Sequence, residues 1–160
     1  MARTTTQHTI VIQSGSYHGV IRREAIADEA LTPGHLVRFD ADEELELHAT
    51  ADGVCVGVLV VLENPTPDTH TYPTTAAIDI PYAADDTAYY AEGTRGDIFN
   101  MLLATSQTAV KGISNLVSNG DGTLKVATVG AGTLANAVVG VADADVTTGT
   151  ATARVRVRIT

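Results

Sequence analysis

The stretch that decides the fold is Ala109–Ala144, AVKGISNLVSNGDGTLKVATVGAGTLANAVVGVADA. Its apolar pair Leu116-Val117 leads into the turn Asn119-Gly120-Asp121-Gly122, and the run Thr123–Val126 leaves the turn on the other side. Asn-Gly and Asp-Gly dipeptides accept the positive φ angles of a tight turn, so apolar runs on both sides of them predict a β-hairpin. The run Ala137–Ala142 predicts a further strand beyond the hairpin.

A similar order of residues occurs earlier in the chain, at Leu31–Val61. There an acidic turn, Asp40–Glu44, takes the place of the Asn-Gly-Asp-Gly turn. The corresponding residues are Gly34 and Gly112, Leu36-Val37 and Leu116-Val117, Leu45 and Leu124, Leu47 and Val126, and Val56-Gly57-Val58 and Val139-Gly140-Val141. The sequence therefore indicates one β-unit that is used twice.

Short runs of apolar and β-branched residues predict most of the remaining structure as strands. These runs are Thr9–Ile12, Gly19–Arg23, His35–Phe39, Leu45–Ala49, Val54–Leu62, Thr87–Ala91, Asp97–Ala104 and Ala153–Ile159. Ile78 and Ile80, on either side of Asp79, predict a further short strand. The one exception is Glu24–Ala30, which predicts a turn or two of helix. We expect an all-β fold, a compact β-barrel or β-clip-like (β-tulip) body, with a jelly roll or two small barrels side by side as the alternatives.

The distribution of polar residues and prolines predicts the domain organisation. Residues 1–8 are polar and Thr-rich, and we expect a flexible N-terminal arm. Residues 9–160 are expected to form a single β domain with a first unit at 9–63 and a second at 83–160. Four of the five prolines lie in the connector 64–82, and proline cannot donate to a β-ladder.

Charge and composition exclude several classes of partner. The formal net charge is -9, which argues against binding nucleic acid or an anionic membrane, because both depend on Lys and Arg. Aromatic residues make up 4% of the chain, so the core is expected to be aliphatic. The single cysteine, Cys55, excludes an internal disulfide and is expected to be a small buried side chain. We expect a soluble protein that is made in the cytoplasm.

The sequence contains no pattern that predicts catalysis, a metal site or a cofactor. The five histidines do not lie at the spacing of zinc ligands, and there is no G-x-S-x-G, P-loop or dinucleotide motif. The Ser118–Thr123 run lacks the acidic positions of a calcium loop, and Arg95-Gly96-Asp97 is explained by the preference of Gly and Asp for turns. We therefore expect a protein that is not an enzyme.

The C-terminal run Ala153–Ile159 alternates strictly between arginine and aliphatic residues. This period of two places Arg154, Arg156 and Arg158 on one face of a strand, with the aliphatic side chains on the other. The arginine face is expected to meet water or an acidic partner. Pairing with carboxylates of the same chain or of a neighbouring subunit is the simpler alternative to a dedicated external ligand.

Four stretches together resemble the head decoration, or capsid cement, proteins of tailed viruses. They are EAIADEALTPGHLV from Glu24, VGVLVVLENP from Val56, RGDIFNMLLATSQTAVKGISNLVSNGDGTLKVA from Arg95, and VVGVADADVTTGTATARVRVRIT from Val138. The resemblance implies a small, mostly β protein on the outside of an icosahedral head. It implies homotrimers at three-fold or quasi-three-fold positions that clamp neighbouring subunits of the major capsid protein. Under this resemblance, the face of Arg154, Arg156 and Arg158 is a candidate contact with another subunit or with the capsid.

A cement protein also needs an extended segment that can add a strand to a partner's sheet. The segment Thr4, Thr5, Thr6, Gln7 and His8, which leads into Ile10, is the candidate for this capsid-binding arm. Two other functions stay open. One is another virion or surface-layer component, such as a head fibre base or tail subunit, and the other is a trimeric β-clip enzyme of the dUTPase kind.

Overall fold

The structure, a computed structural model, describes residues 9–14, 20–55, 57–64, 77–128 and 137–160. Within these ranges the chain forms β-strands and one short 3₁₀ helix, η1 (Ala77–Asp79). The strands are β1 (Val11–Gln13), β2 (Ile21–Ile26), β3 (Leu36–Phe39), β4 (Leu45–Leu47), β5 (Val58–Val61), β6 (Thr87–Gly93), β7 (Ile98–Leu103), β8 (Thr108–Ala109), β9 (Asn115–Ser118), β10 (Leu124–Val126), β11 (Val138–Ala142), β12 (Val146–Thr147) and β13 (Ala153–Ile159). The predicted all-β fold is confirmed. The described residues include no helix that is long and apolar enough to cross a membrane.

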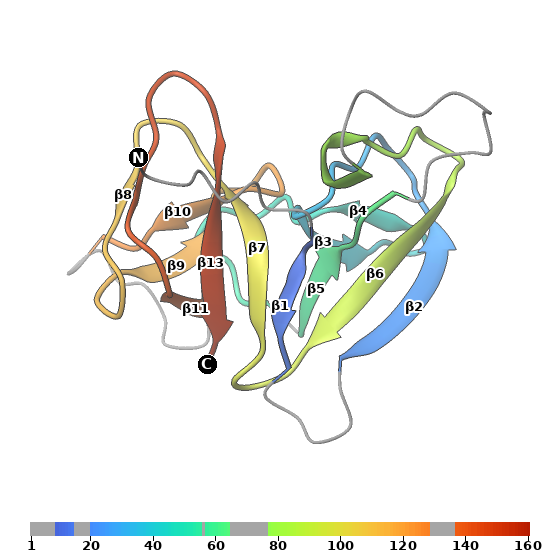
Figure 1. Cartoon of the computed structure of the whole chain (residues 1–160). Coiled ribbons are helices and arrows are strands. Elements are labelled where there is room, and N and C mark those ends of the chain that lie inside the picture. The colour runs from blue at the N-terminus through green and yellow to red at the C-terminus, as the bar shows by residue number, and fades with distance from the viewer. Residues whose placement is uncertain (1–8, 15–19, 56, 65–76, 129–136) are drawn as a thin grey trace.

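Most of the strands form two small barrels that lie side by side (Figure 1), and β8 and β12 pair in a separate two-stranded sheet. The first barrel is a sheet with the order β2-β6-β5-β3-β4, and its ends meet at a parallel bridge between Ala27 and Leu45. The second has the order β7-β10-β9-β11-β13 and closes because β13 also pairs with β7. β1 adds to the edge of β7, outside the closed ring. The predicted barrel architecture is confirmed. It takes the form of two small barrels side by side, which was one of the two alternatives, and not of a jelly roll.

The two barrels have the same strand order. Strands β2, β3, β4, β5 and β6 of the first correspond to β7, β9, β10, β11 and β13 of the second. Each barrel closes through a parallel bridge at one leucine, Leu45 with Ala27 and Leu124 with Leu103. The hydrogen bond beside the bridge is also repeated: the Asp28 N–H donates to Leu45 O (2.9 Å), and the Ala104 N–H donates to Leu124 O (2.8 Å).

The repeated unit is therefore a whole five-stranded barrel, which is larger than the unit that the sequence indicates. Some residues of the two copies also correspond differently from the correspondence that the sequence indicates. The correspondence of Leu45 with Leu124 is confirmed by the bridges. Val37, rather than Leu36, corresponds to Leu116, because these two residues pair with Leu47 and Val126. Gly140 corresponds to Leu59 rather than to Gly57. A β-bulge in β11 shifts the register there, and such an extra residue is not visible in a pattern of glycines and aliphatics.

The boundary between the barrels lies after β6. Since β6 follows the segment 64–82 in sequence and pairs with β2 and β5, the predicted connector comes before the last strand of the first barrel and does not separate the two barrels. The link between barrels is the turn from Thr94 to Asp97, in which the Asp97 carboxylate accepts hydrogen bonds from the Thr94 N–H and hydroxyl. Asp97 is completely buried, so the Arg95-Gly96-Asp97 tripeptide is part of a turn, as predicted. The single-domain assignment of 9–160 stays a prediction.

Two local predictions are wrong. The segment Glu24–Ala30 begins in the strand β2 and is not helical, because its first residues pair with β6. The residues around Asp79 form the helix η1 and not a strand. In both segments the local pattern was weak and long-range contacts decide the structure.

Each barrel has its own apolar core. The larger cluster fills the second barrel around Phe99, Met101 and Leu103 and continues onto the neighbouring side of the first. The smaller fills the first barrel around Leu31, Leu45 and Tyr90. The larger cluster joins the two bodies, because it also includes Leu36, Val60 and Leu62 of the first barrel.

Candidate functional site

The predicted capsid-binding arm lies mostly outside the described part of the chain. Thr4, Thr5, Thr6, Gln7 and His8 belong to residues 1–8, which the structure does not describe. Ile10 is described, and its side chain is completely buried in the larger core. Its N–H donates to Glu63 Oε1, and its carbonyl accepts from the Asn100 N–H at 2.7 Å. Ile10 is therefore held within its own chain, and the role of the arm stays a prediction.

The segment that follows the arm is already an added strand. β1 pairs antiparallel with β7, with Val11 opposite Phe99 and Gln13 opposite Ile98. The Asn100 side-chain amide also donates to Thr9 O at 2.6 Å. Val11–Gln13 therefore form a strand that is added to a sheet of the same chain, and strand addition by the residues before them stays a prediction.

The predicted arginine face exists on β13. Val155, Val157 and Ile159 are buried, whereas the three arginines lie on the opposite side of the strand. The structure does not group the arginines at one free surface. Arg154 contacts the first barrel, and Arg156 and Arg158 contact Asp143.

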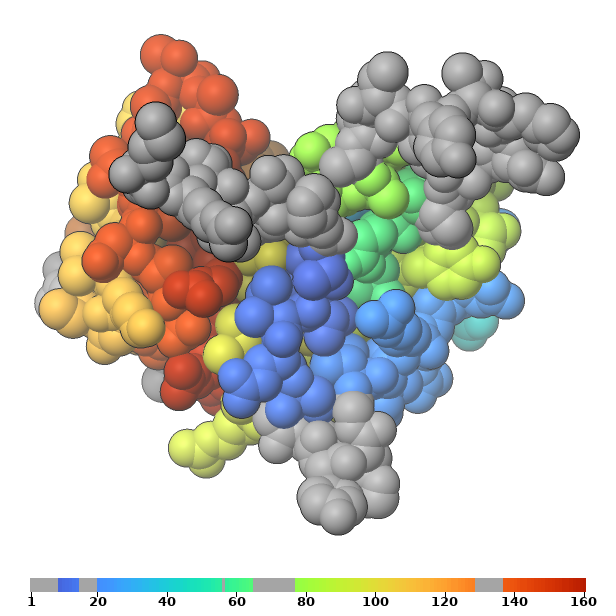
Figure 2. All heavy atoms as spheres, viewed as in Figure 1, coloured from blue at the N-terminus to red at the C-terminus, as the bar shows by residue number. Residues whose placement is uncertain are grey.

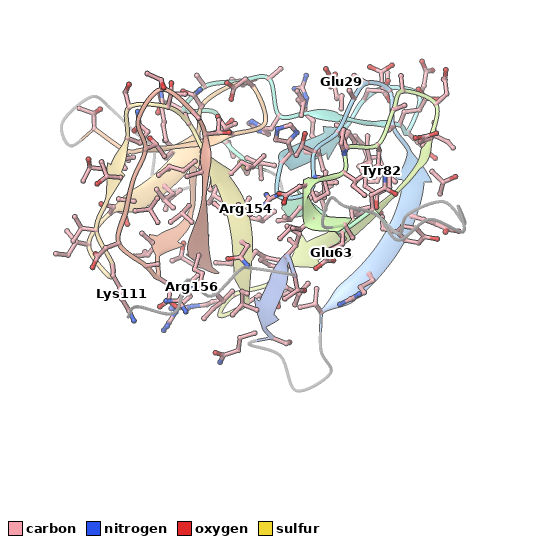
Figure 3. All side chains as sticks on the ribbon, turned by 45° about the horizontal axis from the view of Figure 1, so that its top comes forward. Glu29, Glu63, Tyr82, Lys111, Arg154 and Arg156 are labelled. Atoms are coloured by element: carbon pink, nitrogen blue, oxygen red, sulfur yellow. The ribbon has the colours of Figure 1, made fainter. Side chains whose placement is uncertain are left out.

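Arg154 lies between the two barrels (Figure 3). Its Nη1 donates to Pro33 O at 2.7 Å, and its Nη2 donates to Ile78 O and lies 3.1 Å from Asp79 Oδ1. The side chain is only 12% exposed. Both carbonyl acceptors belong to the first barrel's part of the chain, so Arg154 ties β13 to the Pro33 turn and to η1.

The other two arginines pair with a single acidic residue. Arg158 Nη2 lies 2.9 Å from Asp143 Oδ1, and Arg156 Nη2 donates to Asp143 O at 3.3 Å. The Arg158 side chain is 56% exposed. Pairing with carboxylates of the same chain, the simpler alternative, is therefore observed for Arg154 and Arg158, whereas Arg156 donates to a backbone carbonyl. A contact with a second subunit or with the capsid stays a prediction.

The Asn119–Gly122 turn has a role that the sequence did not predict, because it docks onto the first barrel. The Leu36 N–H donates to Gly122 O at 2.8 Å, and the Asp52 N–H donates to Ser118 O at 3.0 Å. Lys125 Nζ adds an ion pair with Asp52 Oδ2 at 2.7 Å. These bonds join residues that are distant in sequence, so the hairpin pattern alone could not indicate them.

A histidine, a serine and the cysteine meet beside this turn. His48 Nδ1 lies 2.8 Å from Ser118 Oγ, and Cys55 Sγ lies 3.7 Å from His48 Nε2. Burial lowers the pKa of His48 and raises the pKa of the Cys55 thiol. His48 and Ser118 are both buried, and Ser118 Oγ also accepts the Gly120 N–H at 3.2 Å. The group therefore packs the junction between the barrels, and a protonated thiol is a weak nucleophile.

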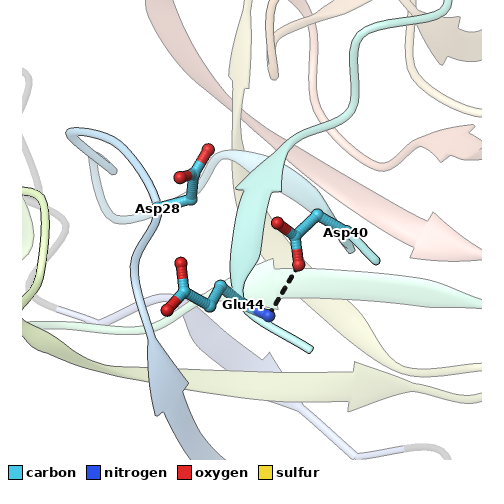
Figure 4. Close-up of side chains that lie close together, drawn as sticks. All are labelled: Asp28, Asp40 and Glu44. Atoms are coloured by element: carbon cyan, nitrogen blue, oxygen red, sulfur yellow. Dashed lines mark hydrogen bonds between the residues drawn. The ribbon is translucent and has the colours of Figure 1, made fainter. Parts of the chain in front are cut away.

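Three carboxylates gather on the first barrel (Figure 4). One oxygen from each of Asp28, Asp40 and Glu44 lies within 4.8 Å of the others. Asp40 Oδ1 accepts the N–H groups of Asp42 and Glu44 at 2.9 Å, which forms the acidic hairpin turn. Desolvation, followed by Asp40 and Asp28, raises the pKa of Glu44. Sequence reasoning missed this proximity because Asp28 comes close only through the bridge at Leu45.

Comparison with known proteins gives a structural similarity but no similarity in sequence. No protein-family model matches the chain, and no curated protein matches it by sequence. Among solved structures the fold is similar to that of the head fibre gp8.5 N base of bacteriophage phi29, with a TM-score of 0.53 and 14% sequence identity. The match covers 88% of this chain and 94% of the phage chain. At this identity the similarity establishes a shared fold, which extends over both barrels.

Proposed function

We propose that this protein is a structural component of a virus particle and that it binds the outer surface of an icosahedral head as a decoration or cement protein. The observation that carries the proposal is the fold match to a phage head fibre base over 88% of the chain. The resemblance of the sequence to decoration proteins supports the same location. The partners would be the major capsid protein and further copies of this chain.

The arrangement of the barrels is suited to this role. A cement protein acts as a rigid body that holds neighbouring capsid subunits together, and many weak contacts repeated over a shell add up to strong retention. Backbone hydrogen bonds, the Arg154 contacts and a shared apolar core hold the two barrels together. A structural protein of this kind would have no catalytic activity, and a dUTP hydrolysis assay tests the enzyme alternative.

A second candidate function is the base of a head fibre. It is favoured by the similar structure, which is itself the base of a head fibre. Both candidates place the protein on the capsid exterior. They differ in the effect on the head, because a cement protein stabilises the shell and a fibre base only needs to be anchored to it.

The test is to mix the purified protein with expanded, undecorated heads and to examine them by electron cryo-microscopy and by heating. Added density at three-fold positions together with greater heat resistance supports the cement function. Density without a change in heat resistance supports the fibre base. Unexpanded heads serve as the control for a surface that forms only on expansion, and the absence of density on expanded heads would contradict both candidates.

A further inference from the structure

The two barrels differ at the outer edge of their first strand. In the second barrel this edge, on β7, is covered: the Asn100 N–H donates to Ile10 O at 2.7 Å, and the Leu102 N–H donates to Gly34 O at 3.0 Å. In the first barrel the equivalent strand is β2, which lies at the end of its sheet. Within the described part of the chain, no strand lies along the outer edge of β2.

The backbone groups of β2 that have no strand partner among the described residues follow from its pairing with β6. The Ala27 N–H donates to Asp86 O on the β6 side at 2.9 Å. Amide groups alternate in direction along a strand, so those of Arg22, Glu24 and Ile26 point away from β6. The closing bridges make Ala27 equivalent to Leu103, so Glu24 corresponds to Asn100 and Ile26 to Leu102. These are the two positions whose amides are bonded in the second barrel.

The exposure of the two strands differs in the same way. All six residues of β7 are buried. On β2 only Ala25 is partly buried, and Ile21 and Ile26 are 48% and 40% exposed. Figure 2 shows β1 and β2, in dark and lighter blue, on one exposed face of the molecule. A long, exposed edge strand with apolar side chains is a template for pairing with another chain.

We propose that the outer edge of β2 receives the N-terminal segment, residues 1–8, of a second copy of this protein as an added strand. The equivalent edge in the second barrel is filled by the N-terminal strand of this chain, so a segment of the same kind fits the free position. The segment is Thr-rich and precedes β1 directly. Eight extended residues span about 26 Å, which is enough to run along the six residues of β2.

An arm that pairs with the next copy makes a head-to-tail contact, which closes into a ring when the rotation between copies allows it. The inference concerns self-association in solution, and it does not depend on the proposed function. It assigns a specific surface, β2, to the contact between copies that the sequence analysis expected only in general terms.

The test compares the full chain with two variants and a control by analytical ultracentrifugation. Deletion of residues 2–8 removes the added strand, and Glu24→Pro removes an outward N–H while leaving the β6 ladder intact. Both should weaken self-association by roughly tenfold or more, since each removes hydrogen bonds of the added strand. Glu24→Thr keeps the N–H and should associate like the original chain.

Hydrogen exchange gives a second readout, because the amides of Glu24 and Ile26 should be protected in the oligomer and lose protection on deletion of residues 2–8. The inference is overturned if the full chain stays monomeric at all concentrations. Protection of these amides in a monomer would mean that the same chain covers the edge of β2, and this result also overturns the inference. It is also overturned if the oligomer survives the deletion unchanged. Because the deletion does not touch β2, it remains informative even if Glu24→Pro fails to fold.

Discussion

His35 is a partly buried ionisable residue at the junction between the barrels. Its Nδ1 accepts the Thr32 N–H at 3.1 Å. Burial is the main cause that lowers its pKa to about 4, against an opposing effect of Asp121, and Arg154 lowers it further. The folded protein therefore holds His35 neutral at a pH where the unfolded chain, with an ordinary pKa of 6.5, would bind a proton.

The consequence is a loss of stability in mild acid. The contribution of His35 to the free energy of unfolding is fully present above pH 6.5 and declines as the pH falls towards 4. Only the unfolded state gains a proton in this window, and the total loss is up to about 3 kcal/mol. His35→Asn keeps an acceptor and removes the titration. Urea unfolding between pH 4 and 7 should give a flatter stability profile for this variant, and parallel profiles would contradict the assignment.

Arg154 should contribute much more to stability than Arg158, although both lie on the same face of β13. Arg154→Met leaves the carbonyls of Pro33 and Ile78 without their donor, and the free energy of unfolding should fall by about 2–4 kcal/mol. Arg158→Met breaks an ion pair whose arginine is 56% exposed, and the loss should stay below about 1 kcal/mol. Chemical denaturation measures both. Similar losses would mean that Arg154 does not tie the barrels together.

At the scale of elements, the turn after β9 holds the second barrel in contact with the first. Comparing alanine substitutions at two glycines distinguishes the loss of this contact from the cost of backbone strain. Gly120 and Gly112 both have positive φ, 91° and 70°, so alanine costs about 1–2 kcal/mol of strain at either position. A Cβ on Gly120 would also lie 2.9 Å from the backbone nitrogen of Ala51 in the first barrel, whereas a Cβ on Gly112 would meet no atom within 4 Å.

We therefore expect Gly120→Ala to lower the free energy of unfolding by at least about 1 kcal/mol more than Gly112→Ala, because it also forces the two barrels apart. Thermal unfolding of the two variants side by side is the measurement. If the two losses are equal, the turn does not hold the barrels in contact.

The elements that the sequence predicts well are those whose pattern is local. The hairpin at Asn119–Gly122 and the alternation of Ala153–Ile159 each contain their own signal, and both are confirmed. β2 was missed in part because Glu24–Ala30 has a helix-like composition, while its partner β6 lies far along the chain. The partners of Arg154 could not be predicted for the same reason, since Pro33 and Ile78 approach β13 only when both barrels are folded.

At the scale of the whole molecule, the contacts between the barrels decide whether they behave as one domain. The larger apolar cluster contains residues of both, and backbone hydrogen bonds cross the junction at Leu36, Asp52 and Leu102. Separating the barrels would expose part of this cluster and leave buried amides without partners, so neither barrel is expected to stay folded when the other unfolds.

Calorimetry should therefore record a single transition, with equal calorimetric and van't Hoff enthalpies. Arg154→Met removes contacts between the barrels without altering the interior of either, since Arg154 lies on the outward face of β13. This variant should broaden the transition or split it, whereas Arg158→Met should lower its midpoint only slightly and keep its shape. Two separate transitions in the original chain would instead mean that the repeated barrels are independent domains, and that a rigid two-barrel body is not the unit that docks on a surface.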